Sequence, residues 1–265
     1  MGKEIEIKEM RTIQMGIMDK IHSYCVANSI RYSLCGGTLL GAVRHKGYIP
    51  WDDDIDIFMP RPDYERFLNN YIDDEGIIAI QHYKNDITYP LRWARAVDKR
   101  TKLVSITSIS GIFVDIFPVD GLPSPEEAVE YEKKLKKLRK DLYRTTKLQG
   151  EALRKNTLFL NIKYFIKKIL FKGRKEVLEE YDRLFNNCNF ETSHYAGAIV
   201  SRFGAKELLD TSVFKTYIQL PFEGKMYNCI KDYDTYLKKL YGNYMQLPPE
   251  EKRITHHNFK VYWKD

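Results

Sequence analysis

The chain has 265 residues, of which 43% are hydrophobic and 13% aromatic, and this composition excludes an intrinsically disordered protein. It carries 43 lysine and arginine residues against 36 aspartate and glutamate residues, which gives a net charge of +7. A basic chain favours anionic partners, which include nucleic acids, phosphorylated metabolites and acidic lipids.

The four cysteines form no CxxC pair and have no ligand spacing with histidine, which argues against a zinc site. No apolar run reaches about 18 residues, so the sequence predicts no membrane-spanning helix. The first residues are charged, unlike those of a signal peptide. We therefore expect a reduced, cytoplasmic protein.

The predicted elements begin with an amphipathic helix over residues 5–29, where apolar residues recur every three or four positions. A short extended segment, a helical turn and a Gly- and Pro-containing loop follow. Next come a strand, a helix and three further strand candidates. In chain order these eight elements are expected at 32–35, 38–43, 46–50, 54–59, 62–72, 77–83, 91–97 and 112–117.

The second half of the chain favours helices. Ser124 is a typical N-cap, Pro125 suits the first helical position, and the helix should continue to about residue 148. A second basic helical region is expected over 153–186, and the tail from residue 228 is rich in tyrosine. The sequence therefore predicts an α+β protein in a single domain 1–265, with a mixed core in 1–120 and a helical elaboration in 121–265.

Three aspartates at every second position are the most informative feature of the chain. In an extended strand Asp52, Asp54 and Asp56 would project to one face, while Ile55 and Ile57 project to the other. Carboxylates gathered in this way suit a divalent cation, which prefers oxygen ligands. One alternative is a calcium-binding loop, but its sixth position requires glycine and is isoleucine in this chain. The other alternative is a solvated acidic turn, which the interleaved isoleucines disfavour.

Two further features support a phosphate-binding metal site. Gly36, Gly37 and Thr38 lie between a predicted strand and a helical turn, where glycine lets backbone N–H groups approach a phosphate; an ordinary turn is the alternative. Asp115 is an isolated acid in the apolar segment 111–118. Its burial is costly unless it binds a metal or, alternatively, a core arginine or lysine.

These motifs resemble the LicD family of phosphotransferases, which is related to the fukutin-type transferases and to the nucleotidyltransferase superfamily. The resemblance rests on GGTLLGAVRHKGYIPWDDDIDIFMPRPDYERF, on FVDIFPVDGLP and on the tail YDTYLKKLYGNYMQLPPEEKRITHHNF. It is strongest over 35–67, clear over 111–121 and 232–259, and weak over 122–200. It implies a nucleotidyltransferase-like core of a mixed sheet with flanking helices.

The resemblance also implies an activity. Family members move a phospho-alcohol, typically phosphocholine, from a CDP carrier to a hydroxyl of a glycan, here a cell-surface glycan of the teichoic acid or lipopolysaccharide type. In family terms Asp54, Asp56 and Asp115 hold Mg²⁺ or Mn²⁺, and Asp52 is an additional acid. Such a metal neutralises charge on the pyrophosphate of the CDP-alcohol. Either Asp115 or Asp52 could accept the proton of the attacking hydroxyl, and the sequence does not choose between them.

The loop before the aspartates contains candidate substrate-binding residues. Arg44, His45 and Lys46 could contact the phosphates, or could pair with the aspartates as counterions. Tyr48 and Trp51 could stack on a base or enclose a choline cation, and packing in the core is the alternative.

Two segments of the second half carry further hypotheses. His256 and His257 gain a role near the active site from the resemblance, although an exposed histidine pair is more often incidental. Residues 158–175 combine an apolar helical face with flanking lysines. That pattern predicts peripheral contact with the inner face of the cell membrane, which would hold the site near a lipid-linked acceptor; a packed helix with solvated lysines is the alternative.

Two rival functions remain open. A nucleotidyltransferase that moves NMP from an NTP would use the same metal site. A basic nucleic-acid-binding protein would fit the net charge, but the basic residues over 133–175 belong to no RNA-binding motif, so we expect no nucleic acid partner.

Overall fold

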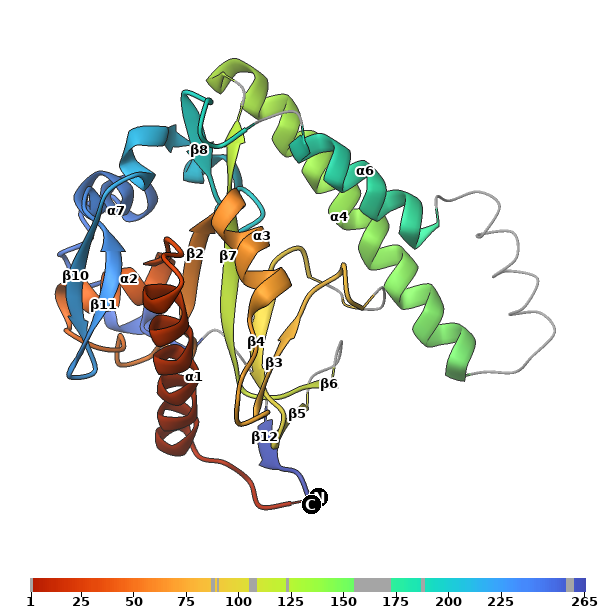
Figure 1. Ribbon diagram of the computed structural model, residues 1–265, viewed down its shortest axis with the longest axis vertical. Helices are drawn as coiled ribbons and strands as arrows, with labels where there is room; N and C mark the ends of the chain where they lie inside the picture. Colours follow the sequence, from red (N-terminus) through yellow and green to blue (C-terminus); the bar gives the residue numbers. More distant parts are fainter. Residues whose placement is uncertain are drawn as a thin grey trace.

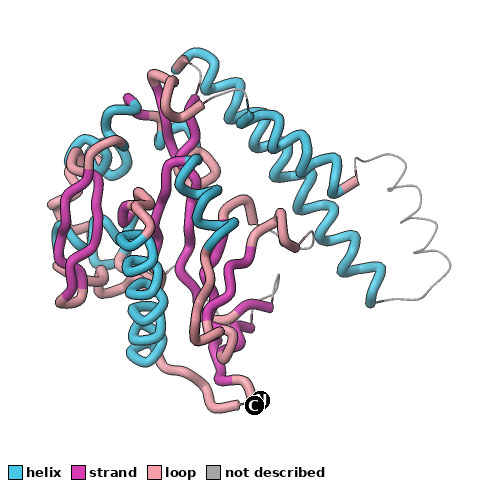
Figure 2. The backbone as a smooth tube through the Cα atoms, viewed as in Figure 1, coloured by secondary structure: helices cyan, strands magenta, loops and turns pink. Residues whose placement is uncertain are grey.

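The computed structural model describes residues 2–86, 89, 91–104, 109–122, 124–154, 173–186, 189–255 and 260–265. Within these residues a curled, mixed sheet occupies the centre, and helices lie against it and beside it (Figures 1 and 2). The fold is therefore α+β, as the sequence predicts.

The central sheet contains β1 (Ser33–Leu34), β2 (Asp56–Pro60), β3 (Ile78–Gln81), β4 (Ala94–Asp98), β7 (Phe113–Leu122), β8 (Tyr195–Gly197) and β9 (Leu209–Asp210). A hairpin is formed by β10 (Tyr217–Phe222) and β11 (Lys225–Ile230), and a small sheet by β12 (Lys260–Trp263), β5 (Thr101–Val104) and β6 (Ile109–Ser110). The described helices are α1 (Ile7–Ala27), α2 (Gly36–Arg44), α3 (Arg61–Asn70), α4 (Pro125–Arg154), α6 (Arg174–Asn186) and α7 (Tyr233–Tyr241). Short 3-10 turns are η1 (Gly204–Glu207), η2 (Thr211–Phe214) and η3 (Glu250–Lys252).

Strand β7 is the centre of the sheet. All ten of its residues are buried, and it pairs in parallel with β2 and antiparallel with β4 and β8. The strand order is β1-β2-β7-β4-β3, with β8 and β9 attached at the far end of β7. A strand buried on both faces reads as a continuous apolar run, which is why 112–117 is recognisable in the sequence.

The helices follow their sequence signals. Helix α1 buries one stripe that includes Met10, Ile17 and Ile21, and this spacing confirms the predicted amphipathic helix. Helix α3 has a proline in its first turn, and α4 begins at Pro125 as predicted. Helices α4 and α6 pack against each other and extend away from the sheet as an arm (Figure 1).

Two expectations about strands are wrong. The second half of the chain is not only helical, because β8 to β12 all lie there. The hairpin turn between β10 and β11 uses Glu223 and Gly224, both at positive φ (49° and 75°), and its short Glu-Gly signal is easily missed. The strand expected over 54–59 begins only at Asp56.

The two ends of the described chain lie together. The backbone N–H of Ile5 donates to the carbonyl of Val261 at 2.8 Å, and Glu4 and Tyr262 form an isolated antiparallel β-bridge (Figure 1). Most of the predicted membrane-contact segment 158–175 lies outside the described residues, as do His256 and His257. None of the helices that the structure describes is long and apolar enough to cross a bilayer.

Candidate functional site

The aspartates lie at the start of β2 and in the segment that leads into it. Burial alternates along this segment: Asp53, Ile55 and Ile57 are buried, whereas Asp52, Asp54 and Asp56 are partly exposed. The predicted shared face is therefore present, although sheet pairing includes only Asp56.

Helix α1 fixes the segment before β2. The guanidinium of Arg11 donates to the carbonyl oxygens of Pro50 (3.2 Å) and Asp52 (2.5 Å). The amide of Gln14 donates to the carbonyl of Asp53 at 2.9 Å. Tyr48 is buried and donates its hydroxyl to Gln14 at 3.0 Å, so its side chain packs in the core of this support. Because these bonds hold the backbone, the carboxylates are presented by a fixed loop.

The start of α2 lies against the same carboxylates. Gly36 has φ +52°, and a Cβ at this position would lie 3.5 Å from Oδ2 of Asp56. At Gly37 a Cβ would lie only 2.7 Å from Oδ2 of Asp52, which is closer than real Cβ atoms approach. The hydroxyl of Thr38 accepts from the backbone N–H of Asp56 at 2.8 Å. The Gly-Gly-Thr motif is therefore more than a turn, because it provides the space that Asp52 occupies.

Asp115 lies beside Asp56 and is bound by an arginine. The two aspartates are register partners on β2 and β7, and Arg95 of β4 is the register partner of Asp115 on its other side. Nε of Arg95 donates to Oδ1 of Asp115 at 2.7 Å, and its terminal nitrogen donates to Oδ2 at 3.3 Å. The salt bridge that the sequence leaves open is thus present, and it gives the buried carboxylate of Asp115 a charged partner. A role for Asp115 as a metal ligand stays a prediction.

The carboxylates crowd one another. Burial, and then the charges of Asp54, Asp115 and Asp52, raise the pKa of Asp56 well above its usual range, while Arg202 lowers it in part. Burial also raises the pKa of Asp52, and hydrogen bonding to Asp54 and the charge of Arg202 lower it in part.

A divalent cation would relieve this repulsion, and the oxygen donors present fit one. In the described part of the chain, Asp52, Asp53 and Asp54 are the acids whose ligand oxygens lie within 4.8 Å of one another. Asp54, Asp56 and Asp115, the set that the family resemblance implies, are not among the described groups whose ligand oxygens all lie within this distance.

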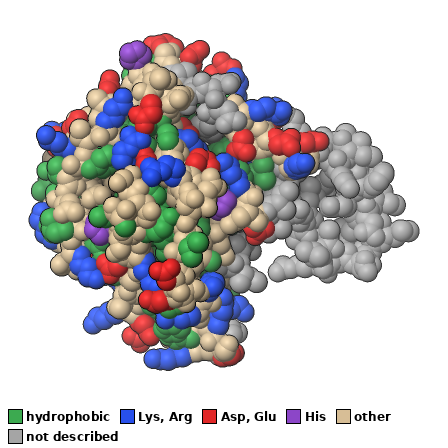
Figure 3. Space-filling view, in the orientation of Figure 1, with side chains coloured by type: hydrophobic (Ala, Val, Ile, Leu, Met, Phe, Trp, Pro, Cys, Tyr) green, Lys and Arg blue, Asp and Glu red, His purple; other side chains and the backbone are tan. Residues whose placement is uncertain are grey.

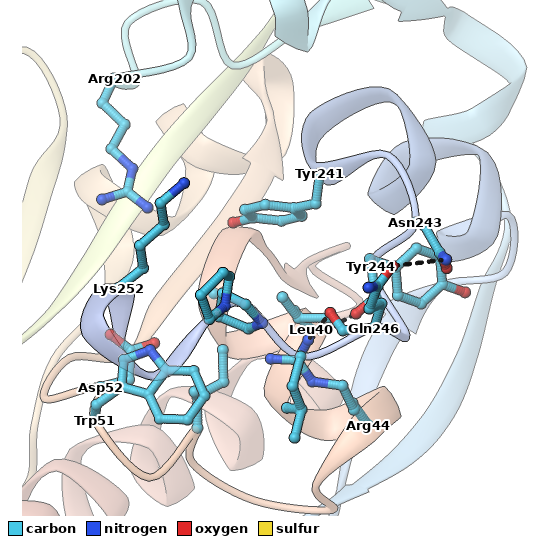
Figure 4. Close-up of a pocket in the computed structure, with 15 residues that line it drawn as sticks. Leu40, Arg44, Trp51, Asp52, Arg202, Tyr241, Asn243, Tyr244, Gln246 and Lys252 are labelled. Atoms are coloured by element: carbon cyan, nitrogen blue, oxygen red, sulfur yellow. Dashed lines mark hydrogen bonds between the residues drawn. The ribbon is translucent and has the colours of Figure 1, made fainter. Parts of the chain in front are cut away.

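A cavity of about 490 Å³ opens beside Asp52 (Figure 4). Its basic lining residues are Arg44, Arg202 and Lys252, and its aromatic ones are Trp51, Tyr241 and Tyr244. The remaining lining residues are Gly37, Leu40, Ile49, Asp52, Asn243, Gln246, Leu247, Pro248 and Pro249.

In Figure 4 the guanidinium of Arg202, the amino group of Lys252 and the hydroxyl of Tyr241 point toward one part of this cavity. The Tyr241 hydroxyl is buried without a hydrogen-bond partner among the described residues. An anion bound beside Asp52 would meet these donors.

The substrate-binding candidates from the loop divide into two groups. Arg44 and Trp51 line the cavity, whereas His45, Lys46 and Tyr48 are not among its lining residues. Arg44 donates to the carbonyl of Tyr244 at 2.7 Å and to the ring of His45 at 2.9 Å, and neither of these partners is an aspartate. Lys46 donates to the carbonyl of Val43 at 3.0 Å.

Sequence reasoning missed Arg202, Tyr241 and Lys252. Each comes from a segment more than 140 residues after the aspartates, and isolated arginines, tyrosines and lysines are common in this chain. Tyr241 and Lys252 fall in the tail that carries the family resemblance, so the tail could have been searched for them. Arg202 lies within a turn and carries no local signal.

Comparison with known proteins adds three findings. A family model described as "LicD/FKTN/FKRP, nucleotidyltransferase domain" matches residues 29–159, which include all four candidate aspartates. The chain is 30% identical to "Lipopolysaccharide cholinephosphotransferase LicD" of Haemophilus influenzae, over 98% of this chain and 99% of that relative. Shorter matches reach 41% identity over 24% of the chain with an uncharacterized protein of Rickettsia typhi, and 54% over 16% with one of Rickettsia prowazekii. These two matches cover 21% and 15% of the respective relatives.

Proposed function

The chain belongs to the LicD family of phosphotransferases, and on this premise we propose that it transfers phosphocholine from CDP-choline to a hydroxyl of a cell-surface glycan in a metal-dependent reaction. The observation that carries the proposal is that Asp52, the first of the three alternating aspartates, lines a cavity that is also lined by three cations. Carboxylates that hold a divalent metal, next to cations that bind phosphate oxygens, are the two parts that transfer from a diphosphate requires. The relative named for the same reaction type aligns along almost its whole length.

The metal fits the acidic side of the site. Asp54 and Asp56 would hold Mg²⁺ or Mn²⁺, and Asp115 would be a further ligand on the neighbouring strand. When bound, the ion supplies charge neutralisation to the diphosphate and its leaving group.

The reaction proposed for the chain's own residues begins with donor binding. Arg202 and Lys252 bind the oxygens of the diphosphate and hold it beside Asp52. The acceptor hydroxyl oxygen then forms a bond to the phosphorus that carries choline, and the bond from that phosphorus to the oxygen of CMP breaks. CMP leaves with the electron pair of that bond.

Asp52 is the better candidate for the base. It lines the cavity, whereas Asp115 is occupied by its salt bridge to Arg95. A base has to lie within hydrogen-bond reach of the proton that it accepts. We therefore propose that the hydroxyl proton passes to Asp52.

Aromatic lining residues support choline as the alcohol. Quaternary ammonium groups bind aromatic faces, and the cavity presents Trp51, Tyr241 and Tyr244. The guanidinium of Arg253 lies 5.7 Å from the centre of the Trp51 ring, which shows that this ring already accepts a cation on one face.

A nucleic acid partner is disfavoured by the distribution of charge. On the face shown in Figure 3, basic and acidic side chains of the described residues are interspersed and form no basic stripe. A small phosphorylated substrate needs only the local cluster of cations in the cavity.

The experiment that tests the proposal is CMP release from a panel of CDP-alcohols with Mg²⁺, with and without a glycan acceptor. We expect acceptor-dependent CMP release from CDP-choline, and less from CDP-glycerol or CDP-ribitol. Pyrophosphate release from an NTP, with no reaction of any CDP-alcohol, would instead identify a nucleotidyltransferase and overturn the proposal.

A further inference from the structure

Arg92 is a buried arginine whose guanidinium has no hydrogen bond within the described part of the chain. Its side chain precedes β4, and the residue is 7% exposed. None of its three guanidinium nitrogens has a hydrogen-bond partner among the described residues. Its nearest aromatic neighbours are Tyr181, with the ring centre 4.6 Å from the guanidinium carbon, and Tyr83, at 6.0 Å.

Burial of such an arginine lowers the stability of the folded protein. A buried charge is normally paired, and arginine cannot escape by losing its proton, because its pKa stays far above neutral in proteins. Contact with aromatic faces compensates only part of the lost hydration. The five N–H donors of a guanidinium suit an oxyanion, which would satisfy several of them at once.

A small cavity lies where such an anion could bind. Its volume is about 90 Å³, and it is lined by Arg92, Arg202, Lys136, Glu132 and neighbouring residues. Glu132 is paired with Lys136 at 2.5 Å, so the two arginines leave the lining positively charged. A single water needs about 10–15 Å³ on this measure, and the cavity therefore has room for one tetrahedral oxyanion in place of several waters.

Arg202 connects this cavity to the proposed active site. It lines both the small cavity and the larger one that contains Asp52. An extended phosphorylated molecule could therefore place one phosphate at the aspartates and another group beside Arg92.

We propose that Arg92 and Arg202 form a second phosphate-binding subsite, distinct from the position of the diphosphate beside the aspartates. The bound group is a phosphate monoester or diester, contributed either by the nucleotide of the donor or by a phosphorylated acceptor. Anion binding at Arg92 does not depend on the proposed transfer reaction, so the failure of either idea can be recognised separately.

Thermal unfolding in inorganic phosphate tests the subsite. The protein is kept in EDTA, so that no phosphate is held through a metal at the aspartates, and chloride keeps the ionic strength constant. We expect phosphate to raise the melting temperature of the natural protein by about 2–4 °C. Arg92→Met should lose this rise. Arg183→Met, which removes an exposed arginine of α6, should keep it.

A second variant guards against misfolding of Arg92→Met. The side chain of Lys136 is 73% exposed, so Lys136→Glu reverses a charge at the cavity without disturbing the core. It too should lose the response to phosphate. The proposal is overturned if the natural protein gains no stability from phosphate, or if either cavity variant responds as the natural protein does.

Organic phosphates distinguish the two sources. If the subsite binds the donor, Arg92→Met should weaken the binding of CMP about tenfold or more, as expected for a lost charge-assisted hydrogen bond. If it binds the acceptor, CMP binding should be unchanged and binding of a hexose phosphate should weaken by the same factor. If Arg92→Met weakens neither, the subsite has no role with a substrate and the proposal fails.

Discussion

Asp56 and Asp115 occupy matching positions on the adjacent parallel strands β2 and β7, and Arg95 occupies the position matching Asp115 on β4. This arrangement places one carboxylate against an arginine and the other against further carboxylates. Asp115 is therefore stabilised by its neighbour, whereas Asp56 is destabilised by burial and by like charges. The two acids are adjacent, but only Asp56 has an electrostatic need for an added cation.

Replacing Asp115 with asparagine separates its two possible roles. If Asp115 is a metal ligand, we expect transfer to fall by more than about 100-fold in the protein that remains folded. The variant should also lose about 3–5 kcal/mol of stability, since the charge of Arg95 remains buried. Specific activity and urea-induced unfolding, measured on the same samples, check both parts.

The matched control for this change is Asp120→Asn in the same strand. Asp120 forms a buried, two-bonded pair with Arg61 at 2.6 and 2.9 Å, away from the other aspartates. It should lose comparable stability and keep its specific activity when folded. If both variants keep full activity, Asp115 is structural only.

Gly37→Ala should impair activity more than stability. The added Cβ would lie 2.7 Å from Oδ2 of Asp52, so the carboxylate has to move away from its position beside the cavity. We expect at least a tenfold fall in turnover, since small displacements of reacting groups are costly. Gly16→Ala is the control, because nothing lies within 4 Å of its added Cβ and alanine favours the helix by about 0.5–1 kcal/mol. Equal activity of the two variants would show that the position of Asp52 does not matter.

Arg202→Gln should raise the KM for the CDP-alcohol about 10- to 100-fold, the range expected for a lost charge-assisted hydrogen bond of about 1.5–3 kcal/mol. The reason is its position over the cavity, facing Asp52 and Tyr241 (Figure 4). Steady-state kinetics of CMP release provide the measurement. Lys206→Gln, at an exposed position nearby in the sequence, should leave KM unchanged. An unaltered KM in Arg202→Gln would remove this residue from donor binding.

Glu207 should make stability depend on pH. Burial raises its pKa from 4.5 to about 7, although Ser201 donates a hydrogen bond to its carboxylate at 2.9 Å. Because the folded protein holds this proton more tightly than the unfolded chain, the stabilisation is complete below about pH 4.5 and is lost as pH rises through 7. The difference corresponds to about 3 kcal/mol.

Glu207→Gln cannot ionise and should lack this loss of stability. Urea unfolding at pH 5 and pH 8 measures the difference for the natural protein and the variant. If both lose the same stability between these two pH values, another group is responsible for the pH dependence.

The local signals in the sequence predicted much of the central sheet and the helices around it. Helical spacing at Met10, Ile17 and Ile21 and the proline at residue 125 each depend on a few neighbouring residues, and the structure confirms them. The strands after residue 190 were missed. Two of them, β8 and β9, have only three and two residues, which is too short for a periodic pattern, and the turn between the six-residue strands β10 and β11 has only the weak Glu-Gly signal.

The site was predicted where it is local in sequence. The alternation of the aspartates along the chain is local, and it is seen in the alternating burial of residues 52–57. The position of Gly37 is also local, and it is seen in the close approach of this residue to Asp52. The partnership of Asp115 with Arg95 and the placing of Arg202 depend on how separate segments pack. One sequence without its relatives does not specify such pairings.

The most direct test of the central claim is CMP release from CDP-choline by the natural protein and by Asp56→Asn, each with Mg²⁺ and with EDTA. The substitution removes one negative charge and leaves the side-chain volume nearly unchanged. We predict activity only for the natural protein with Mg²⁺, and a loss of more than about 100-fold in the variant or in EDTA. Full activity in EDTA, or in Asp56→Asn, would contradict a metal-dependent reaction at these aspartates.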